Sequence, residues 1–402
     1  MSDDIASLPF WGGFSVTSFT QAGQSVSIRL EPCPSTARTC GHCSSVAPKV
    51  HDVCWRTVRD LPLIGHALTL EVAVYRVKCD GCGRTGSQHV SWLDPHSRVT
   101  RRLAAFVALW SERIPLTHVC QLTGLHWSTV RQIHQQALER KLAALPEARP
   151  KRLVMDEFAL FKGHRYATVV LDADNRQVLW VGEGRSREAI RPFFTWLGAE
   201  RCRAIEVVAM DMNTAFDLEV QKQCPNARVV YDLFHVIAKY GREVIDRVRV
   251  DEANRLRDQS KLRQVVKRSR WLLLRNRENV PAAQLPRLDE LLAANASLMT
   301  AYVMKASLKE LWQTQGGWAW RAAWRNWLAM ARDSGIETLS HFAKKLAPYW
   351  RGILARVRWP MHTGQLEGIN NRIKVMKRMA YGYRDSAFFF LKIKAAFPGN
   401  PR

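Results

Sequence analysis

The sequence predicts an α+β protein with several domains, and three observations lead to this fold class. Two Cys-x-x-Cys pairs lie within residues 1–94, among segments that alternate apolar and polar residues as strands do. Residues 95–150 have a helical period instead, and residues 151–238 alternate strands with helices. With 402 residues and 47% apolar content, the chain is long enough to bury a core in more than one domain.

The charge of the chain indicates the class of its partner. There are 60 Lys and Arg residues against 36 Asp and Glu residues, which gives a formal net charge of +24. A surplus of this size attracts polyanions, so nucleic acid is the expected partner. No run reaches the roughly 18 apolar residues of a membrane-spanning helix, and residues 1–10 lack the charge order of a secretion signal. We therefore expect a cytoplasmic protein without a membrane partner.

Residues 1–94 form the first predicted domain, a module held together by a metal ion. Each Cys-x-x-Cys pair supplies two thiolates, and four thiolates complete the tetrahedral shell of a structural Zn²⁺. The four candidate ligands are Cys40, Cys43, Cys79 and Cys82. Residues 68–77 alternate as a strand that leads into the second pair, so a long hairpin brings the pairs together. The odd total of nine cysteines argues against a disulfide framework. The ligand set stays open because other donors lie nearby, namely Cys33, His42, His51 and Cys54.

Residues 95–150 form the second predicted domain, which is helical and ends in a linker with two prolines. A helix over 116–122, a turn at 123–125 and a second helix capped by Ser128 have the spacing of a helix-turn-helix motif. The second helix presents polar side chains suited to base edges and phosphates, namely Ser128, Thr129, Arg131, Gln132 and Gln135. Any small helical bundle contains such a pair of helices, so it is chiefly the net charge that favours DNA contact here.

Residues 151–238 form the third predicted domain, in which buried strands end in acidic residues. The order of three strands, helix, strand, helix and strand is that of the ribonuclease H fold. In that fold the first and fourth strands end side by side, so Asp156 and Asp211 are expected to converge. Glu157 competes with Asp156, but successive strand residues point to opposite faces, and Asp156 directly ends the apolar run. Asp232 and His235 follow the last strand, and both an accessory and a structural role stay open for them.

Two carboxylates at close range repel each other and favour a divalent cation between them. A third carboxylate would complete a two-metal site, which is suited to phosphodiester cleavage and transfer. Residues 239–362 have a helical period and separate the last strand from the final helices, so we expect an all-helical insertion there. Its basic part can follow a phosphate backbone, and most of its tryptophans are expected in the core.

Residues 363–402 return to the third domain and begin with a basic helix in which Glu367 is acidic. Ile369 and Ile373 share the apolar face of this helix. The polar residues that follow Glu367 are candidate DNA contacts, namely Asn371, Arg372, Lys374, Lys377 and Arg378. From this segment alone, a solvated charged surface is the simpler interpretation.

A series of motifs in one order connects these domains to a known family. They are the paired Cys40-x-x-Cys43 and Cys79-x-x-Cys82 with Arg59-Asp-Leu-Pro62 between them, Met155-Asp-Glu-Phe158, Lys162-Gly-His-Arg-Tyr166, Met210-Asp-Met212, Asp232-Leu-Phe-His235, and Leu366-Glu-Gly-Ile-Asn-Asn-Arg-Ile-Lys374 continuing to Tyr381-Gly-Tyr383. With these motifs the chain resembles the transposases of the ISL3 insertion-sequence family. The resemblance implies a zinc-binding N-terminal domain, a helix-turn-helix and a ribonuclease H-like catalytic domain. It places the catalytic triad on Asp156, Asp211 and Glu367, with Mg²⁺ or Mn²⁺ as cofactor.

The expected function is that of a DNA transposase from a bacterial insertion sequence, associated with the nucleoid when it binds DNA. It would bind the terminal inverted repeats, hydrolyse the phosphodiester at each end and join the freed 3′-hydroxyl to target DNA. Because two ends must be held together, a homodimer on DNA is expected. One alternative is a DNA-binding regulator whose catalytic domain is inactive. A second alternative is a nuclease of the same fold that cuts without joining ends.

Overall fold

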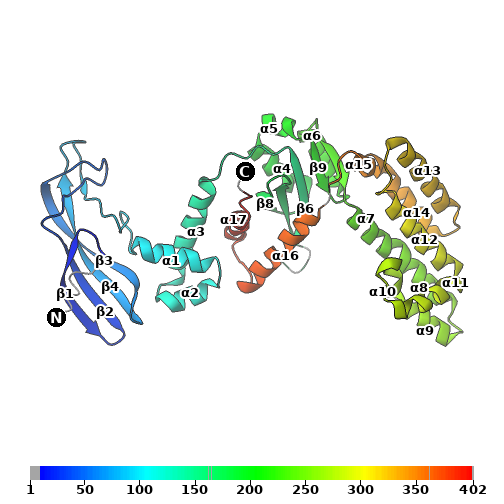
Figure 1. Cartoon of the computed structure of the whole chain (residues 1–402), viewed down its shortest axis with the longest axis horizontal. Helices are drawn as coiled ribbons and strands as arrows, with labels where there is room; N and C mark the ends of the chain where they lie inside the picture. The colour runs from blue at the N-terminus through cyan, green and yellow to red at the C-terminus, as the bar shows by residue number, and fades with distance from the viewer. Residues whose placement is uncertain (1–9, 162, 164, 362, 401–402) are drawn as a thin grey trace. The chain divides into compact units, whose positions relative to one another are not determined.

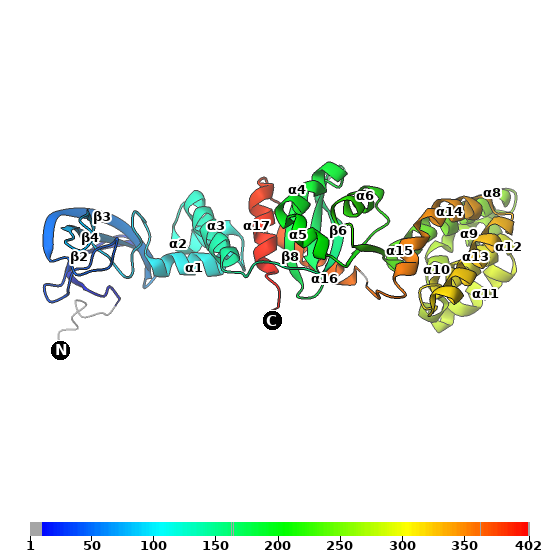
Figure 2. The same cartoon turned by 90° about the horizontal axis from the view of Figure 1, so that it is seen from above.

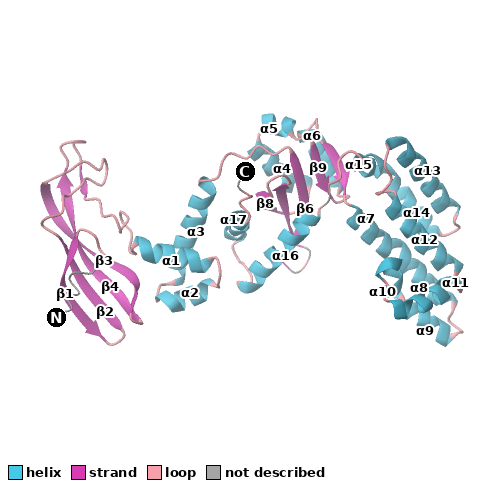
Figure 3. Cartoon of the chain, in the orientation of Figure 1, coloured by secondary structure: helices cyan, strands magenta, loops and turns pink. Residues whose placement is uncertain are grey.

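The computed structural model describes residues 10–161, 163, 165–361 and 363–400. The chain divides into two compact units, Met1–Ala144 with Met376–Arg384, and Leu145–Val375 with Asp385–Arg402. Within the described residues, strands occur in an N-terminal sheet and in a central sheet (Figure 3). In this part of the chain, none of the helices combines the length and the apolar character that crossing a bilayer requires.

The N-terminal sheet has the strand order β1-β2-β4-β3, with β5 paired to β4. The strands are β1 (Phe14–Ala22), β2 (Ser25–Pro32), β3 (Lys49–Leu63), β4 (His66–Lys78) and β5 (Thr85–Ser87). Its core contains Ile28 and Leu30 of β2 together with Leu68 and Leu70 of β4, so alternate residues face inward as the pattern predicts. The long hairpin of β3 and β4 confirms the predicted connection between the two cysteine pairs.

Three helices follow in the same unit, namely α1 (Arg101–Ser111), α2 (Leu116–Thr123) and α3 (Trp127–Ala143). Leu103, Val107, Val119 and Val130 form their shared core. Gly124 ends α2 with a φ of 64°, a left-handed conformation that glycine adopts without strain, and this confirms the predicted turn.

Asp60 on β3 joins the sheet to the first turn of α1. Its buried carboxylate accepts hydrogen bonds from Trp11 Nε1 at 3.0 Å and from Thr100 Oγ1 at 2.6 Å. Arg102 donates to it through Nε at 2.8 Å and forms an ion pair with it through Nη2. Burial opposes the charge of Asp60, but the bonds from Arg102, Thr100 and Trp11 outweigh burial and lower its pKa. The aspartate of the Arg59-Asp-Leu-Pro62 motif is therefore a structural joint.

The central sheet has the order β10-β9-β6-β7-β8. The strands are β6 (Arg152–Phe161), β7 (Arg165–Asp172), β8 (Gln177–Glu183), β9 (Val207–Met210) and β10 (Arg228–Tyr231). The first three are antiparallel, and β9 and β10 run parallel to β6. With α4 (Arg187–Leu197), α5 (Ala199–Ala204) and α6 (Thr214–Gln223) between them, this is the predicted ribonuclease H order.

Helices cover this sheet, as Figures 1 and 2 show. Met155 of β6 belongs to the same core as Phe193 of α4 and Phe216 of α6. Phe158 of β6 packs edge-on against Phe389 with ring centroids 6.5 Å apart. Phe389 belongs to α17 (Ser386–Ala396), which follows α16 (Gly364–Met379). Helices that precede the insertion and a helix that follows it therefore pack against the same sheet.

A helical insertion separates α7 (Leu233–Tyr240) from α16, as predicted (Figures 1 and 2). Its α-helices are α8 (Asp246–Arg255), α9 (Ser260–Arg268), α10 (Arg270–Leu274), α11 (Leu285–Ala293), α12 (Ala296–Glu310), α13 (Gly317–Asp333), α14 (Glu337–Leu346) and α15 (Trp350–Ala355). Trp320, Trp324 and Trp327 of α13 are buried and stack at centroid distances of 5.3 and 6.1 Å. These tryptophans are therefore core residues.

Candidate active site

The register of two parallel strands brings the predicted aspartates together. Val154 of β6 lies opposite Ala209 of β9. Two residues further along stand Asp156, within β6, and Asp211, directly after β9, so their carboxylates lie side by side. The expectation that the first strand ends at Asp156 is wrong, because β6 continues to Phe161 in its pairing with β7. A ligand atom of each, together with one of His235, lies within 4.8 Å of the others. The sequence-predicted convergence of Asp156 and Asp211 therefore matches the geometry.

His235 enters the site from α7, which begins directly after β10. Its Nδ1 lies 2.7 Å from Oδ2 of Asp211. Burial disfavours the charged ring, but the hydrogen bond and the charge of Asp211 outweigh burial and raise the pKa of His235. A protonated imidazole beside two carboxylates can orient an anionic group or a water molecule.

The two aspartates crowd negative charge into a small, partly buried space. Burial, followed by repulsion from Asp211, raises the pKa of Asp156 to about 6. Oδ1 of Asp211 is buried and has no hydrogen-bond partner among the described residues. A buried carboxylate oxygen without a donor, next to a second carboxylate, is suited to a divalent cation.

Asn370 connects α16 to this group. Its Nδ2 donates a hydrogen bond of 2.7 Å to Oδ2 of Asp156. Ile369 and Ile373 are buried beside it, which confirms the predicted apolar face of the helix. Glu367 is exposed and precedes Asn370 by three positions, so the two are neighbours on the helix surface. Among the described residues, the group within 4.8 Å holds Asp156, Asp211 and His235 and does not include Glu367.

Asp232 has a different surrounding from His235. Its Oδ1 accepts from the backbone N–H of Phe234 at 2.9 Å and caps α7. Its Oδ2 accepts from the backbone N–H of Thr363 at 2.8 Å and also from the Thr363 hydroxyl. Both oxygens are therefore used to tie the start of α7 to the residue before α16.

A cavity of about 450 Å³ lies next to Asp211, and Asp156 is not part of its lining. Asp211 and His235 line it, and so does Glu157, whose carboxylate is 3.7 Å from Arg185. Burial raises the pKa of Glu157. Cationic side chains on the wall are Arg185, Lys239 and Arg242. Carboxylates beside a cationic wall suit a phosphodiester bound through a metal ion on one side and through guanidinium or ammonium groups on the other.

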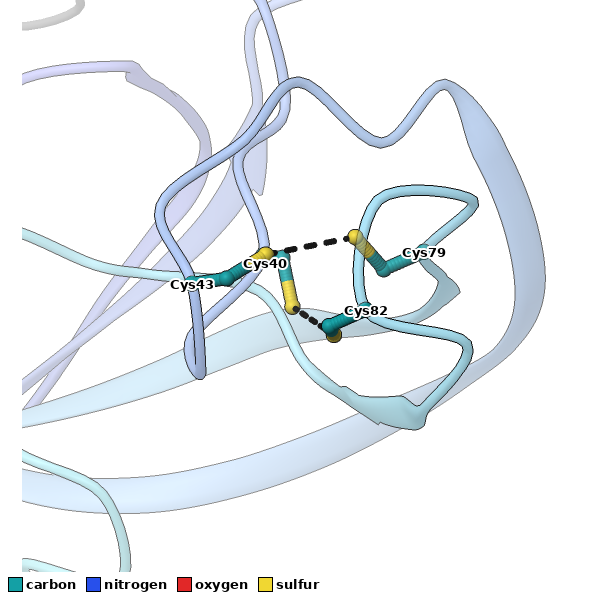
Figure 4. Close-up of side chains that lie close together, drawn as sticks. All are labelled: Cys40, Cys43, Cys79 and Cys82. Carbon is teal, nitrogen blue, oxygen red and sulfur yellow. Dashed lines mark hydrogen bonds between the residues drawn. The ribbon is translucent and has the colours of Figure 1, made fainter.

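The four predicted zinc ligands converge from two loops (Figure 4). Cys40 Sγ lies 3.8 Å from Cys82 Sγ, and Cys43 Sγ lies 3.4 Å from Cys79 Sγ. Two thiolates at 2.3 Å from one tetrahedral Zn²⁺ are about 3.8 Å apart. Of the described residues, these four form the cysteine cluster able to hold a metal.

The alternative zinc donors lie in other surroundings. Cys33 Sγ is 2.9 Å from Ser15 Oγ, and His51 pairs with Asp52 at 3.3 Å. Cys54 is exposed. None of these residues, nor His42, belongs to the cluster that the described part of the chain contains.

The second helix of the helix-turn-helix begins differently from the prediction. His126, not Ser128, is the N-cap residue of α3, because its Nδ1 accepts from the backbone N–H of Ser128 at 3.3 Å. Ser128 and Gln132 are exposed, while Thr129, Arg131 and Gln135 are half-buried. Gln135 donates to Glu139 at 2.9 Å on the same helix.

The predicted contacts on α16 lie on its surface. Asn371, Arg372, Lys374 and Arg378 are exposed, and Lys377 is half-buried. Arg372 stacks over Phe397 at 5.6 Å. Lys162 and His164, which belong to one of the matched motifs, lie outside the described residues. Asn370 is the site residue that the sequence reasoning missed, and its place three positions after Glu367 was the available signal.

Comparisons with known proteins agree with this architecture. Residues 36–82 match the zinc-finger of the transposases IS204/IS1001/IS1096/IS1165, and residues 88–137 match the helix-turn-helix domain of transposase family ISL3. A family described as transposase matches residues 153–393.

Two curated relatives extend over nearly the whole chain. The transposase for insertion sequence element IS1001 of Bordetella parapertussis is 48% identical over 402 residues, covering 99% of this chain and 98% of the relative. The transposase for insertion sequence element IS1557 of Mycobacterium tuberculosis is 26% identical over 395 residues, covering 90% and 86%. The chain therefore belongs to the ISL3 family of DDE transposases.

Proposed function

We propose that the chain hydrolyses the phosphodiester at each end of its own insertion sequence and joins the freed 3′-hydroxyl to target DNA. The observation that carries this proposal is the convergence of Asp156, Asp211 and His235 beside a cationic cavity. Hydrolysis and joining are the same displacement at phosphorus with a different nucleophile, so one site serves both.

Asp156, Asp211 and Glu367 are the proposed ligands of Mg²⁺ or Mn²⁺. When bound, such ions activate the attacking oxygen and stabilise the leaving oxygen. The assignment of Glu367 is supported by the bond from Asn370 to Asp156, which ties the same face of α16 to the aspartates.

The surrounding side chains have proposed roles in holding the phosphate. Arg185, Lys239 and Arg242 would neutralise its charge from the cavity wall. His235 is held by Asp211 and would donate a hydrogen bond to a phosphate oxygen or to the attacking water. Asp232 would keep α7 and α16 in position without touching the substrate.

The N-terminal unit is the proposed reader of the terminal inverted repeats. The zinc module would hold its loops in place, and exposed residues of α3 such as Gln132 would contact the DNA. Two such ends must be brought together for coordinated joining, so a homodimer on DNA is part of this proposal.

The test is incubation of the purified chain with Mg²⁺ and DNA that carries both element ends, followed by separation of cleaved and joined products. Wild type is expected to give both products, and Glu367→Gln is expected to bind the same DNA without cutting it. Arg332→Gln, an exposed change on α13, serves as the active control. If wild type and Glu367→Gln bind equally and neither cuts, the chain is a DNA-binding regulator. Cleavage without joining would identify the chain as a nuclease of the same fold.

A further inference from the structure

A second cleft in the same unit has no role in the site described above. It has a volume of about 660 Å³ and lies where α15 packs against β10, the edge strand of the central sheet. Residues from β10, α6, α13 and α15 line it. The cleft therefore lies where the helical insertion meets the catalytic sheet.

One wall of this cleft forms where the backbone of α15 comes close to a side chain of β10. Gly352 of α15 is buried, and a Cβ added to it would lie 2.4 Å from the ring of Tyr231 on β10. The Tyr231 hydroxyl donates to Asp217 of α6 at 2.7 Å. Tyr349, which precedes α15, packs edge-on against Tyr231 at 5.3 Å. The insertion is therefore fitted closely against the sheet edge at this point.

The lining is strongly cationic. It includes four exposed arginines, namely Arg228, Arg321, Arg351 and Arg358. Its carboxylate, Asp217, accepts bonds from Tyr231 and from Gln221. Among the described residues, no carboxylate lies within 4.0 Å of any of these four guanidinium groups, whereas Arg187 and Arg191 nearby share Glu219. The cleft thus keeps its positive charge.

Aromatic rings hold three of these guanidinium groups in place. Arg321 and Arg351 lie 5.9 and 5.6 Å from the ring centroid of Trp350, and Arg358 lies 5.6 Å from that of Trp359. A guanidinium stacked on a ring is positioned by its face, while its N–H edges stay free for an anion. This differs from a merely solvated charged surface, because each of these guanidinium groups lies against an aromatic ring.

Helix α6 connects this cleft to the active-site cavity. Thr214 at its start lines the cavity, and its hydroxyl lies 3.1 Å from that of Tyr349, which lines the cleft. Asp217 and Gln221, one and two turns later, line the cleft as well. The cleft and the cavity are therefore neighbours along α6.

We propose that this cleft binds the phosphate backbone of DNA next to the scissile bond. The proposal rests on the proposed function, because it needs a phosphodiester in the active-site cavity. Arg321, Arg351 and Arg358 supply the contacts. Their effect is independent of base sequence, since phosphates carry no sequence information. The cleft therefore recognises the length of DNA beside the cut rather than its sequence.

The experiment measures DNA binding without divalent metal, so that binding is separated from cutting. The probes are duplexes with the terminal inverted repeat, ending either at the cleavage position or after a flank long enough to reach the cleft. The variant carries Arg321→Gln, Arg351→Gln and Arg358→Gln, and Arg332→Gln on α13 is the control outside the cleft. Thermal unfolding of each variant shows whether the fold is retained.

Wild type and the control are expected to bind the duplex with the flank more tightly than the duplex that ends at the cleavage position. The triple variant is expected to bind both duplexes with the same affinity. The loss is expected to be at least about tenfold, and the slope of log affinity against log salt should fall by about 0.9 for each contact removed. Equal binding by wild type and triple variant overturns the inference, as does an equal loss on both duplexes. A shift in oligomeric state without a change in flank dependence would assign the cleft to a protein partner and overturn it as well.

The two proposals fail in different ways. If the binding of wild type depends on the flank but no Mg²⁺-dependent products form, the proposed reaction is wrong and the cleft is still a DNA-binding site. If the triple variant still cleaves and joins DNA, and its binding depends on the flank as that of wild type does, the proposed role of the cleft is wrong while the proposed reaction stands.

Discussion

Asn370 of α16 donates a hydrogen bond of 2.7 Å to Asp156 of β6, although 214 positions separate the two residues in the chain. This bond fixes one oxygen of the carboxylate. The backbone N–H of Glu157 fixes the other at 2.8 Å. The orientation of Asp156 therefore depends on a helix made after the whole insertion.

Replacing Asn370 with Ala should release Asp156 and raise the Mg²⁺ concentration needed for half-maximal cleavage. Loss of a residue that orients a metal ligand usually costs about 10–100-fold in metal affinity or activity. The measurement is a Mg²⁺ titration of cleavage. Asn371→Ala on the exposed side of α16 is the comparison, and it should weaken DNA binding while the titration midpoint stays in place. Identical midpoints for Asn370→Ala and wild type would contradict the assigned role.

Zinc should leave the N-terminal module when one of its four thiolates is removed. Cys82→Ser is expected to lower the zinc content of the purified chain well below one ion per chain, because three ligands no longer close the tetrahedron. Cys54→Ser, which changes an exposed cysteine of the same sheet, should keep its zinc. Elemental analysis of both variants tests this, and zinc retained by Cys82→Ser would show that a different donor completes the shell.

Removing the charge of Asp60 should loosen the joint between the N-terminal sheet and α1. Asp60→Asn replaces a buried carboxylate that accepts from Trp11, Thr100 and Arg102. The expected loss is about 1–3 kcal/mol, since Arg102 keeps access to water. Chemical unfolding of the full chain provides the measurement. Asp94→Asn, which breaks an exposed pair with Arg101, should change stability by no more than about 0.5 kcal/mol.

Glu219 should make the stability of the second unit depend on acid pH. Hydrogen bonds from Arg191, Gln223 and Arg187 outweigh the effect of burial and lower the pKa of Glu219 to about 2. Its unfolded pKa is about 4.3, so its stabilising effect is complete above that pH and is lost as the pH falls toward 2. Glu219→Gln should therefore be less stable than wild type at pH 6 and should approach wild type near pH 2. A constant difference between the two across this range would argue against the assigned pairing.

Adding a methyl group at Gly352 should push α15 away from β10. The new Cβ would overlap the Tyr231 ring, and overpacking of this kind costs about 1–3 kcal/mol. Gly368→Ala is the matched change on α16, where a Cβ meets no atom within 4 Å, and it should be neutral or stabilising. Thermal unfolding compares the two. Replacing the Tyr231 ring with the smaller leucine side chain, in the double variant Gly352→Ala with Tyr231→Leu, should restore part of the loss.

Local patterns were enough to predict the elements that carry the aspartates. The apolar runs before Asp156 and Asp211 predict β6 and β9, and Ser186 caps α4 as its position indicates. The bond of Asn370 was not predictable in this way, because a helical period places it at the edge of the apolar face and only the distant strand decides its partner. The cap of α3 was misassigned to Ser128 because a histidine ring nitrogen takes the role that small polar residues usually have.

The place of the insertion determines when the catalytic centre can form during synthesis. Thr363 reaches back 131 positions to Asp232, and Asn370 reaches back further still to Asp156. A chain that stops before Thr363 would retain the zinc module, the helix-turn-helix helices and both aspartates, yet it would lack the helices that close the sheet. If the N-terminal unit binds element ends as proposed above, such a product would occupy them without cutting, and early termination of translation would produce a competitor of the full-length enzyme.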